Sequence, residues 1–131
     1  MPDATAETFT RALQEAEQKR DPGPIVALFA DDAELENLTA KSPATGRDGA
    51  QQFWAKYLDS FRRIASNFTH THQAGDTAVL EWVSEGELPD GQPIRYRGVS
   101  VVEFAGGRVV KFRTYYDSAA FVAAGATGKS Q

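Results

Sequence analysis

The sequence predicts an α+β fold, with helices in the N-terminal half and an antiparallel sheet in the C-terminal half. Apolar side chains between residues 5 and 61 recur at three- and four-residue spacing, which is typical of amphipathic helices. Between residues 70 and 117, three turn signals separate stretches of alternating polarity, which is typical of strands joined by hairpins. We therefore expect a meandering sheet whose inner face is covered by the helices.

The first predicted helix runs from about Thr5 to Arg20 and has one apolar stripe, formed by Phe9, Ala12, Leu13 and Ala16. It ends at residues 21–24, where the sequence Asp-Pro-Gly-Pro breaks a helix. Apolar residues at 25–29 indicate a second, short helix, and residues 33–37 indicate a first short strand.

A loop is expected over 39–46, where serine, proline and glycine gather. A strongly amphipathic third helix follows, with apolar positions at Ala50, Phe53, Trp54, Tyr57, Leu58 and Phe61. Near the C-terminus, Phe121 and Val122 are expected to make a last apolar contact, and residues 123–131 to form a frayed tail.

Three turn signals set the expected register of the strands: Gly75-Asp76, Asp90-Gly91 and Gly106-Gly107. Two-residue loops at the first two turns place His70 opposite Glu81, and Glu81 opposite Ser100. A three-residue loop that ends at Arg108 then places Ser100 opposite Thr114. The sequence thus predicts a polar row of these four side chains across the inner face of the sheet.

The same register predicts an outer face with exposed apolar side chains, at Leu80, Trp82, Val99, Val101 and Tyr115. It also sets Glu103 opposite Lys111 and Arg97 opposite Asp117, which an antiparallel sheet favours because the charges are opposite. Since a large exposed apolar patch marks an interaction surface, we expect a homodimer that buries this face.

Composition narrows the classes of protein. With 131 residues, of which 41% are hydrophobic and 24% charged, the chain is expected to form one domain over residues 1–131. A net charge of −4 without a basic cluster argues against nucleic acid and membrane partners. The absence of cysteine excludes disulfides, thiol catalysis and thiolate metal sites. No signal peptide and no long apolar run occur, so a cytoplasmic protein is expected.

Five segments carry a resemblance to a known family: IVALFADDAEL at 25–35, TGRDGA at 45–50, ELPDGQPIRY at 87–96, GVSVVEF at 98–104 and GRVVKFRTYYD at 107–117. They are similar to the nuclear transport factor 2-like superfamily, in particular to its SnoaL-like and ketosteroid-isomerase-like members. The resemblance implies a cone-shaped curved sheet wrapped around the N-terminal helices, with a pocket open at one end and often a dimer formed through the sheets. Because this fold hosts isomerases, cyclases, hydrolases, dehydratases and binding modules, it implies little about the reaction.

Matched positions argue against two activities of that superfamily. In similar ketosteroid isomerases the general base, a second carboxylic acid and a tyrosine match Asn37, Ser100 and Leu13 here, and an amide cannot take a proton from carbon. In similar limonene-epoxide hydrolases an asparagine matches Asn37. Their arginine and two aspartates, however, match Glu81, Val83 and Thr114. The resemblance therefore implies neither activity with its usual residues.

The leading hypothesis is cofactor-independent proton transfer, such as isomerisation, polyketide-type cyclisation or dehydration, on a mostly apolar small molecule with oxygen groups. Glu81 would move the proton and His70 would be its partner. The candidate substrate-binding residues are Asn37, Trp54, Tyr57, Tyr96, Ser100, Phe112, Thr114 and Tyr116. The alternatives are a non-catalytic ligand-binding or interaction module and an epoxide-hydrolase-like enzyme with an altered site.

Each candidate also has a purely structural interpretation. Glu81 is either an acid or base, or a carboxylate held by the hydroxyls of its neighbours, and Asn37 either orients a ligand or caps a turn. His70 and His72 share one face and are either functional or ordinary strand residues. Together with Glu81 they offer metal-ligand atoms, but no third ligand near His72 is clear, and neither a metal nor another cofactor is expected.

Overall fold

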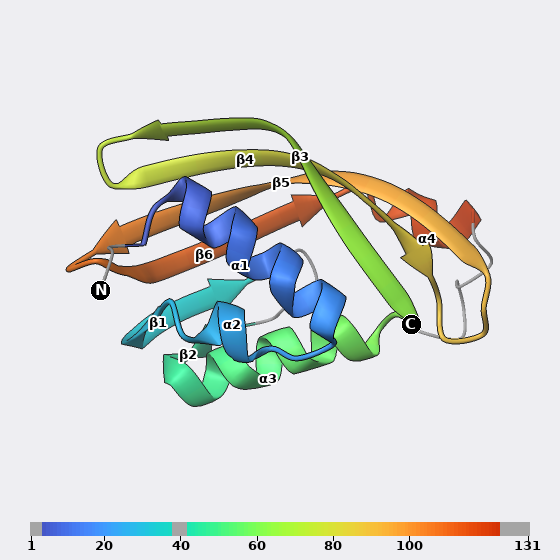
Figure 1. Cartoon of the computed structure of the whole chain (residues 1–131), viewed down its shortest axis with the longest axis horizontal. Helices are drawn as coiled ribbons and strands as arrows, with labels where there is room; N and C mark the ends of the chain where they lie inside the picture. The colour runs from blue at the N-terminus through green and yellow to red at the C-terminus, as the bar shows by residue number, and fades with distance from the viewer. Residues whose placement is uncertain (1–3, 38–41, 124–131) are drawn as a thin grey trace.

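A computed structural model, which describes residues 4–37 and 42–123, confirms the α+β class (Figure 1). Its elements are α1 (Ala6–Lys19), α2 (Gly23–Val26), β1 (Phe29–Glu36), β2 (Ala44–Thr45), α3 (Gly46–Asp59), β3 (Arg63–Ala74), β4 (Thr77–Glu87), β5 (Pro93–Ala105), β6 (Arg108–Tyr116) and α4 (Ala119–Ala123). The strands form one sheet in the order β2-β1-β6-β5-β4-β3, in which only β1 and β6 are parallel among the described strands. The predicted loop over 39–46 and the predicted tail fall partly outside the described residues.

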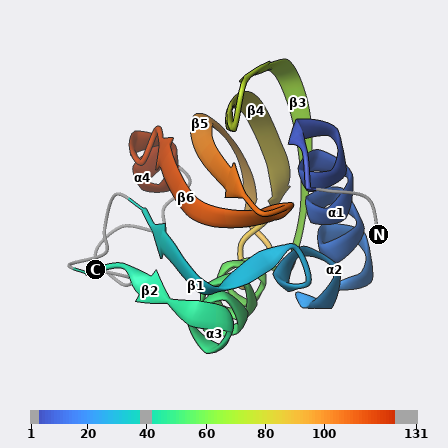
Figure 2. The same cartoon turned by 90° about the vertical axis from the view of Figure 1, so that its left-hand side faces the viewer.

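The long strands β3 to β6 arch over α1 and α3, so the inner face of the sheet is covered by both helices (Figure 2). Four aromatic rings join these layers, with Phe9 of α1 and Trp54 of α3 each in contact with Phe29 and Phe112. This aromatic centre joins both helices to the inner face of the sheet.

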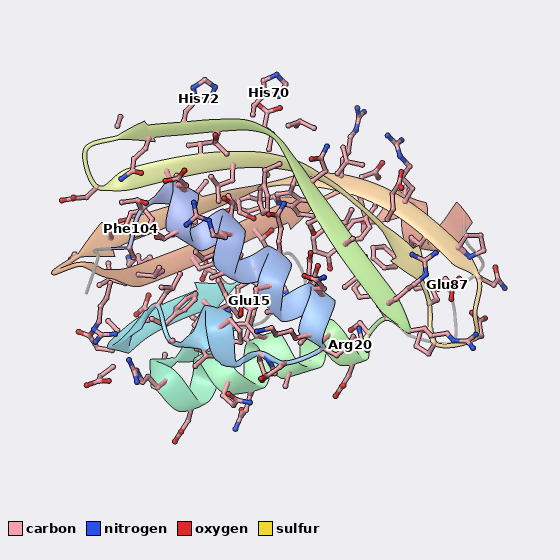
Figure 3. All side chains as sticks on the ribbon, in the orientation of Figure 1. Glu15, Arg20, His70, His72, Glu87 and Phe104 are labelled. Carbon is pink, nitrogen blue, oxygen red and sulfur yellow. The ribbon has the colours of Figure 1, made fainter. Side chains whose placement is uncertain are left out.

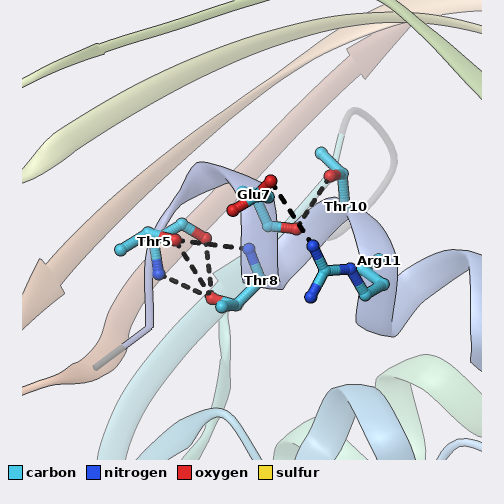
Figure 4. A network of polar contacts seen from close by, with 5 residues as sticks. All are labelled: Thr5, Glu7, Thr8, Thr10 and Arg11. Atoms are coloured by element: carbon cyan, nitrogen blue, oxygen red, sulfur yellow. Dashed lines mark hydrogen bonds and ion pairs between the residues drawn. The ribbon is translucent and has the colours of Figure 1, made fainter. Parts of the chain in front are cut away.

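Helix α1 begins at a capping box (Figure 4). The backbone N–H of Thr8 donates to Thr5 Oγ1 at 3.3 Å, and the backbone N–H of Thr5 donates to Thr8 Oγ1 at 2.7 Å. The helix ends at Arg20, whose N–H donates to the carbonyl of Ala16. The left-handed backbone of Arg20 (φ 59°) lets the N–H of Asp21 donate to the same carbonyl at 3.1 Å. Both ends are thus fixed by local hydrogen bonds, which sets the rotation of the helix and the side chains that it buries.

The second predicted helix is shorter than expected. Helix α2 ends at Val26, and Phe29 begins β1, because the carbonyl of Leu28 already accepts a hydrogen bond from Val109 of β6. Near the C-terminus, Phe121 packs on Tyr96 as predicted, whereas Val122 is exposed.

The turn between β3 and β4 has the predicted register. Ala74 pairs with Thr77 around Gly75 (φ 58°), and His70 lies opposite Glu81. A bulge at Thr69 interrupts the pairing between Phe68 and His70. The bulge changes the side of the strand that each residue presents, so Phe68 packs against the core while His70 is exposed.

The predicted register between β4 and β5 is wrong by one residue. Ser100 lies opposite Leu80, and Glu81 lies opposite Val99. The turn is a three-residue loop at 89–91, closed by a hydrogen bond from the N–H of Leu88 to the carbonyl of Gln92 at 2.8 Å. A two-residue loop at 90–91 would require an N–H from residue 89, which is a proline and has none.

Because side chains alternate along a strand, this shift exchanges the faces of β4. Leu80 and Trp82 lie on the inner face and are 0% and 8% exposed, so they cannot belong to the predicted dimer surface. Glu81 lies on the outer face, and the predicted polar row is therefore split between the two faces.

The pairing of β5 with β6 agrees with the prediction at Ser100 and Thr114, and at Glu103 and Lys111. The loop itself has two residues, Gly106-Gly107, both with positive φ, and a bulge after Glu103 restores the expected register. The N–H of Asp117 donates to the carbonyl of Arg97, as the predicted pairing requires. No described helix is long and apolar enough to cross a membrane.

Candidate functional site

A cavity of about 450 Å³ lies between the inner face of the sheet and helix α3. Its wall is rich in aromatic rings, from Phe53, Trp54, Tyr57, Phe61, Trp82, Tyr96, Phe112, Tyr116 and Phe121. Polar side chains of α3 and of the residues after β1 add to the lining, among them Asn37, Gln52, Lys56 and Ser60. The volume and the mostly apolar wall are those of pockets that bind small molecules.

All the predicted substrate-binding residues line this cavity, namely Asn37, Trp54, Tyr57, Tyr96, Ser100, Phe112, Thr114 and Tyr116. They come from α3, from β5 and β6, and from the chain just after β1. The fold thus brings together residues that lie up to 79 positions apart in the sequence, from Asn37 to Tyr116. Their role in binding stays a prediction.

The predicted catalytic pair is not in the cavity. Glu81 and His70 face each other on the outer side of the sheet, with 3.8 Å between Oε1 and Nδ1 and with side chains that are 55% and 65% exposed. His70 and His72 point away from the helices (Figure 3). The expectation that Glu81 faces the pocket is wrong because β4 pairs with β5 one residue away from the predicted register.

Two hydroxyl groups form a first polar cluster on the cavity wall. Trp82 Nε1 donates to Ser100 Oγ at 3.0 Å, and Ser100 Oγ lies 3.0 Å from Thr114 Oγ1. The indole therefore satisfies one lone pair of Ser100, and the two hydroxyls share one hydrogen bond in either direction. The Thr114 hydroxyl keeps hydrogen-bonding capacity for a polar group in the cavity.

The second polar cluster is a buried carboxylate connected to three hydroxyl side chains, which we call the Glu17 network: Glu17, Tyr57, Ser66 and Ser84. Glu17 is 3% exposed, and its Oε2 accepts from the hydroxyls of Tyr57 (2.5 Å) and Ser66 (2.6 Å). Its Oε1 accepts from the backbone N–H of Ser66 at 2.8 Å. Ser66 Oγ is also 2.7 Å from Ser84 Oγ. Tyr57, Ser66 and Ser84 line the cavity, so the carboxylate is connected to it through hydroxyls.

Burial raises the pKa of Glu17, and the hydrogen bonds from Ser66 and Tyr57 oppose this shift only in part. Burial also raises the pKa of the Tyr57 and Tyr96 phenols, which therefore stay protonated under ordinary conditions. The ionisable group that changes state most readily in this network is thus the Glu17 carboxyl.

Glu17 was not among the residues predicted from the sequence, although the sequence contains a signal. The buried side of α1 carries Phe9, Leu13, Ala16 and Glu17, so the glutamate continues the apolar stripe at helical spacing. A glutamate in such a stripe is almost never fully buried unless it is paired. The hydrogen-bond partners of Glu17 come from β3 and α3, and the apolar stripe of α1 alone does not identify them.

Trp54 supplies a further polar atom near the cavity. Its Nε1 is the one buried side-chain N or O atom in residues 4–37 and 42–123 that has no hydrogen-bond partner. A buried donor without a partner costs free energy, and an acceptor oxygen on a ligand is a suitable partner for it.

Metal binding has no geometric support in the described part of the chain, where no three His, Asp or Glu side chains are grouped so that they could hold an ion. The alternative site at His70, His72 and Glu81 therefore has no complete ligand set among these residues.

Comparison with known proteins agrees with the fold. A family model described as a SnoaL-like domain matches residues 9–112. No curated protein sequence matches the chain. Among solved structures, a Catenulispora acidiphila protein with a ketosteroid isomerase-like fold, in complex with trimethylamine, is similar over 97% of this chain and 98% of its own (TM-score 0.83, 19% identity).

Two further structures are similar at the same level of identity. A putative isomerase from Bacillus subtilis is 19% identical over 92% of each chain, with a TM-score of 0.79. A Mycobacterium tuberculosis protein in complex with estradiol-17beta-hemisuccinate is 19% identical over 88% of this chain and 95% of its own, with a TM-score of 0.74. At such low identity these likenesses concern the fold.

Proposed function

Because the chain belongs to the SnoaL-like domain family, we propose that it binds a mostly apolar small molecule with one or two oxygen groups in the cavity under α3. The observation that carries this proposal is the wall of the cavity, where aromatic rings surround the hydroxyls of Ser100, Thr114 and the Glu17 network. Aromatic faces favour a planar apolar body, and a few fixed polar groups favour a defined orientation of its oxygen atoms.

Proteins of similar fold give this proposal support. One is in complex with estradiol-17beta-hemisuccinate, another is a designed 17-OHP binder, and a third was crystallised with polyporic acid. The pocket of this chain is built from its own side chains, so its ligand need not be any of these compounds.

A binding experiment with a matched pair of variants tests the proposal. Gln51 and Gln52 are neighbouring exposed residues of α3, and only Gln52 lines the cavity. We expect 2-acetylnaphthalene, a flat aromatic ketone, to bind the wild-type protein in isothermal titration calorimetry. Gln52→Trp should weaken this binding about tenfold or more by filling the cavity mouth, whereas Gln51→Trp should not. Equal affinities of both variants and wild type would contradict binding in this cavity.

A second candidate function is proton transfer without a cofactor, and the Glu17 network is the observation that favours it. A buried carboxyl with a raised pKa beside a small-molecule cavity is a frequent arrangement in enzymes that move protons. Glu17 would hold the proton, and Tyr57 and Ser66 would pass it to or from an oxygen atom of the substrate. The leading hypothesis from the sequence is thereby kept, but the carboxylate is Glu17 in place of Glu81. The same network in a protein without turnover would serve binding alone.

We also propose a homodimer formed through the outer face of the sheet. The corrected outer face carries Val79 and Tyr115, which are 37% and 43% exposed, together with the half-buried Val83, Val99 and Val101. These side chains lie on β4, β5 and β6 and take the place of the predicted surface that included Leu80 and Trp82. Glu81 and Arg113 lie among these apolar side chains, opposite Val99 and Val101. The exposed apolar side chains are the part of this face that favours an interface between copies.

A further inference from the structure

We propose that the Glu17 network is a subsite for a ligand oxygen that only accepts hydrogen bonds, such as a ketone or ester carbonyl, and that the ligand binds together with a proton on Glu17. The inference rests on the proposed binding function, since it assigns the chemistry of one part of the same cavity. It depends on counting the hydroxyl protons of the network in the two states of the carboxyl group.

In the ionised state, the carboxylate of Glu17 offers only acceptors. Oε2 takes the single proton of Tyr57 and the single proton of Ser66, and Oε1 takes the backbone N–H of Ser66. Since the Ser66 hydroxyl has then given away its proton, Ser84 must be the donor in the 2.7 Å contact between their Oγ atoms. All hydroxyl protons of the network are then used within it, so the network itself presents only lone pairs to the cavity.

In the protonated state, one of these bonds is reversed. The acid proton belongs on Oε2, since Oε1 faces a backbone N–H that cannot change direction. The acid then donates to Tyr57 or to Ser66. In the first case the Tyr57 proton is released, and in the second Ser66 donates to Ser84, whose proton is released. Either way one donor becomes available at a side chain that lines the cavity.

The two states therefore select different ligands. A carbonyl oxygen has no proton to give, so beside the ionised network it would lie against lone pairs, which costs free energy in a buried site. Beside the protonated network it accepts one hydrogen bond. An alcohol or phenol can donate as well as accept and is suited to both states. We therefore expect the binding of carbonyl ligands to be coupled to protonation of Glu17. The binding of purely apolar ligands should not be coupled to it.

The other ionisable groups near Glu17 are two buried phenols and a set of exposed or half-exposed charged side chains. The phenols that interact with it are Tyr57 of α3 and Tyr96 of β5, and burial keeps both protonated. Helix α2 has no ionisable side chain. The charged side chains of β3 and β4 are exposed or half-exposed, at Arg63, His70, His72, Glu81, Glu85 and Glu87. On α3, next to Tyr57, the exposed Lys56 lines the same cavity. At the end of α1, the exposed Arg20 donates to the carbonyl of Phe61.

Two naphthalene derivatives of nearly equal size test the inference. Neither 2-acetylnaphthalene, which has one carbonyl, nor 2-ethylnaphthalene, which has no oxygen, titrates between acidic and mildly alkaline pH. For the wild-type protein, we expect the dissociation constant of the ketone to rise by up to about tenfold per pH unit above the pKa of Glu17. The dissociation constant of the hydrocarbon should stay constant.

Glu17→Gln should remove the pH dependence. Its amide nitrogen, placed at the position of Oε2, donates to both Tyr57 and Ser66, whereas the protonated acid donates to only one of them. At least one hydroxyl proton is therefore released toward the cavity at every pH, and the affinity for the ketone should not depend on pH. Glu15→Gln is the matched control, since Glu15 lies on the same helix, pairs with Lys19 at 2.6 Å and takes no part in the hydrogen bonds of the Glu17 network. It should keep the wild-type pH dependence. If Glu17→Gln does not fold, calorimetry of wild type in two buffers of different ionisation enthalpy measures the proton uptake directly.

The outcomes separate the inference from the proposed function. Ketone binding that does not change with pH, and that takes up no proton, would overturn the inference while leaving the cavity as a binding site. A parallel loss of ketone and hydrocarbon binding would overturn it too, because the pH would then act on the whole pocket. If neither compound binds at any pH, the proposed binding function itself is contradicted.

Discussion

The indole of Trp82 lies directly against the backbone of Gly98 on the neighbouring strand. A Cβ atom placed on Gly98 would be 2.6 Å from Cζ2 of Trp82 and 2.4 Å from the carbonyl oxygen of Tyr115. The absence of a side chain at residue 98 therefore lets the ring lie on the sheet, from where its Nε1 reaches Ser100. One wall of the cavity depends on this contact.

Gly98→Ala is accordingly expected to lower the free energy of unfolding, by about 1 to 3 kcal/mol as overpacked sites do, and to weaken ketone binding. Chemical denaturation and calorimetry measure the two effects. Gly75→Asn is a suitable comparison, since a Cβ on Gly75 meets nothing within 4 Å and asparagine tolerates its positive φ. A Gly98→Ala protein as stable as wild type would show that both the Trp82 ring and the backbone of Tyr115 can move aside freely.

The two tryptophans should both report on the cavity. Trp54 and Trp82 line it from α3 and from β4, so 2-acetylnaphthalene should quench the fluorescence of each. We expect Trp54→Phe and Trp82→Phe each to lose part of the quenching while the other tryptophan keeps its own. The register expected from the sequence puts Trp82 on the outer face, where a ligand in the cavity would not quench it. Quenching through Trp54 alone would mean that Trp82 lies on the outer face and would contradict the structure.

The difference between these assignments shows what the sequence could determine. The periodicity of α1 and α3 and the order of the strands predicted the fold, because amphipathic patterns over many residues agree with one another. The register of β4 depended on one turn, where Asp90-Gly91 indicated a two-residue loop. Pro89 excludes that loop, and a single residue of shift moved every side chain of β4 to the other face.

The cavity residues of β5 and β6 lie on the expected face of the sheet because Ser100 pairs with Thr114 as predicted. The sequence did not reveal the reason for this pairing. The loop is one residue shorter than predicted, and the bulge after Glu103 shifts the register back by one residue. The Glu17 network could not be assembled in advance. Its members come from α1, α3, β3 and β4, and only the packing of these elements brings their side chains within hydrogen-bond distance.

Changes at the originally predicted catalytic pair should have little effect. Glu81 and His70 are exposed and 3.8 Å apart, and such pairs in water contribute up to about 1 kcal/mol. We expect Glu81→Gln and His70→Gln to bind 2-acetylnaphthalene like wild type, with the same pH dependence. Titration calorimetry checks this. A clear loss of ketone binding in Glu81→Gln would mean that the outer face takes part in ligand binding.

Assembly should depend on the corrected outer face. Tyr115→Glu places a charge within the apolar patch and is expected to convert a dimer into a monomer in sedimentation velocity. Arg108→Glu, at the exposed start of the same strand, adds the same side chain outside the patch and should leave the dimer intact. A wild-type protein that sediments as a monomer at micromolar concentration, or a Tyr115→Glu dimer, would exclude this interface.

Stability should reveal the buried carboxyl through its pH dependence. Burial raises the pKa of Glu17 above its ordinary value of 4.5, so the folded protein holds this proton more tightly than the unfolded chain does. The contribution of Glu17 to the free energy of unfolding is then complete at pH below 4.5 and is lost as the pH rises through the pKa of the folded state. Glu17→Gln does not titrate, so its free energy of unfolding relative to wild type should increase over this interval and level off above it.

Each tenfold difference in proton affinity between the folded and unfolded states corresponds to about 1.4 kcal/mol. Urea denaturation of both proteins across this pH range measures the difference, with Glu15→Gln as the exposed comparison. A difference between Glu17→Gln and wild type that is constant across the range, or that falls as the pH rises, would mean that the carboxyl is not held in its protonated form by the fold.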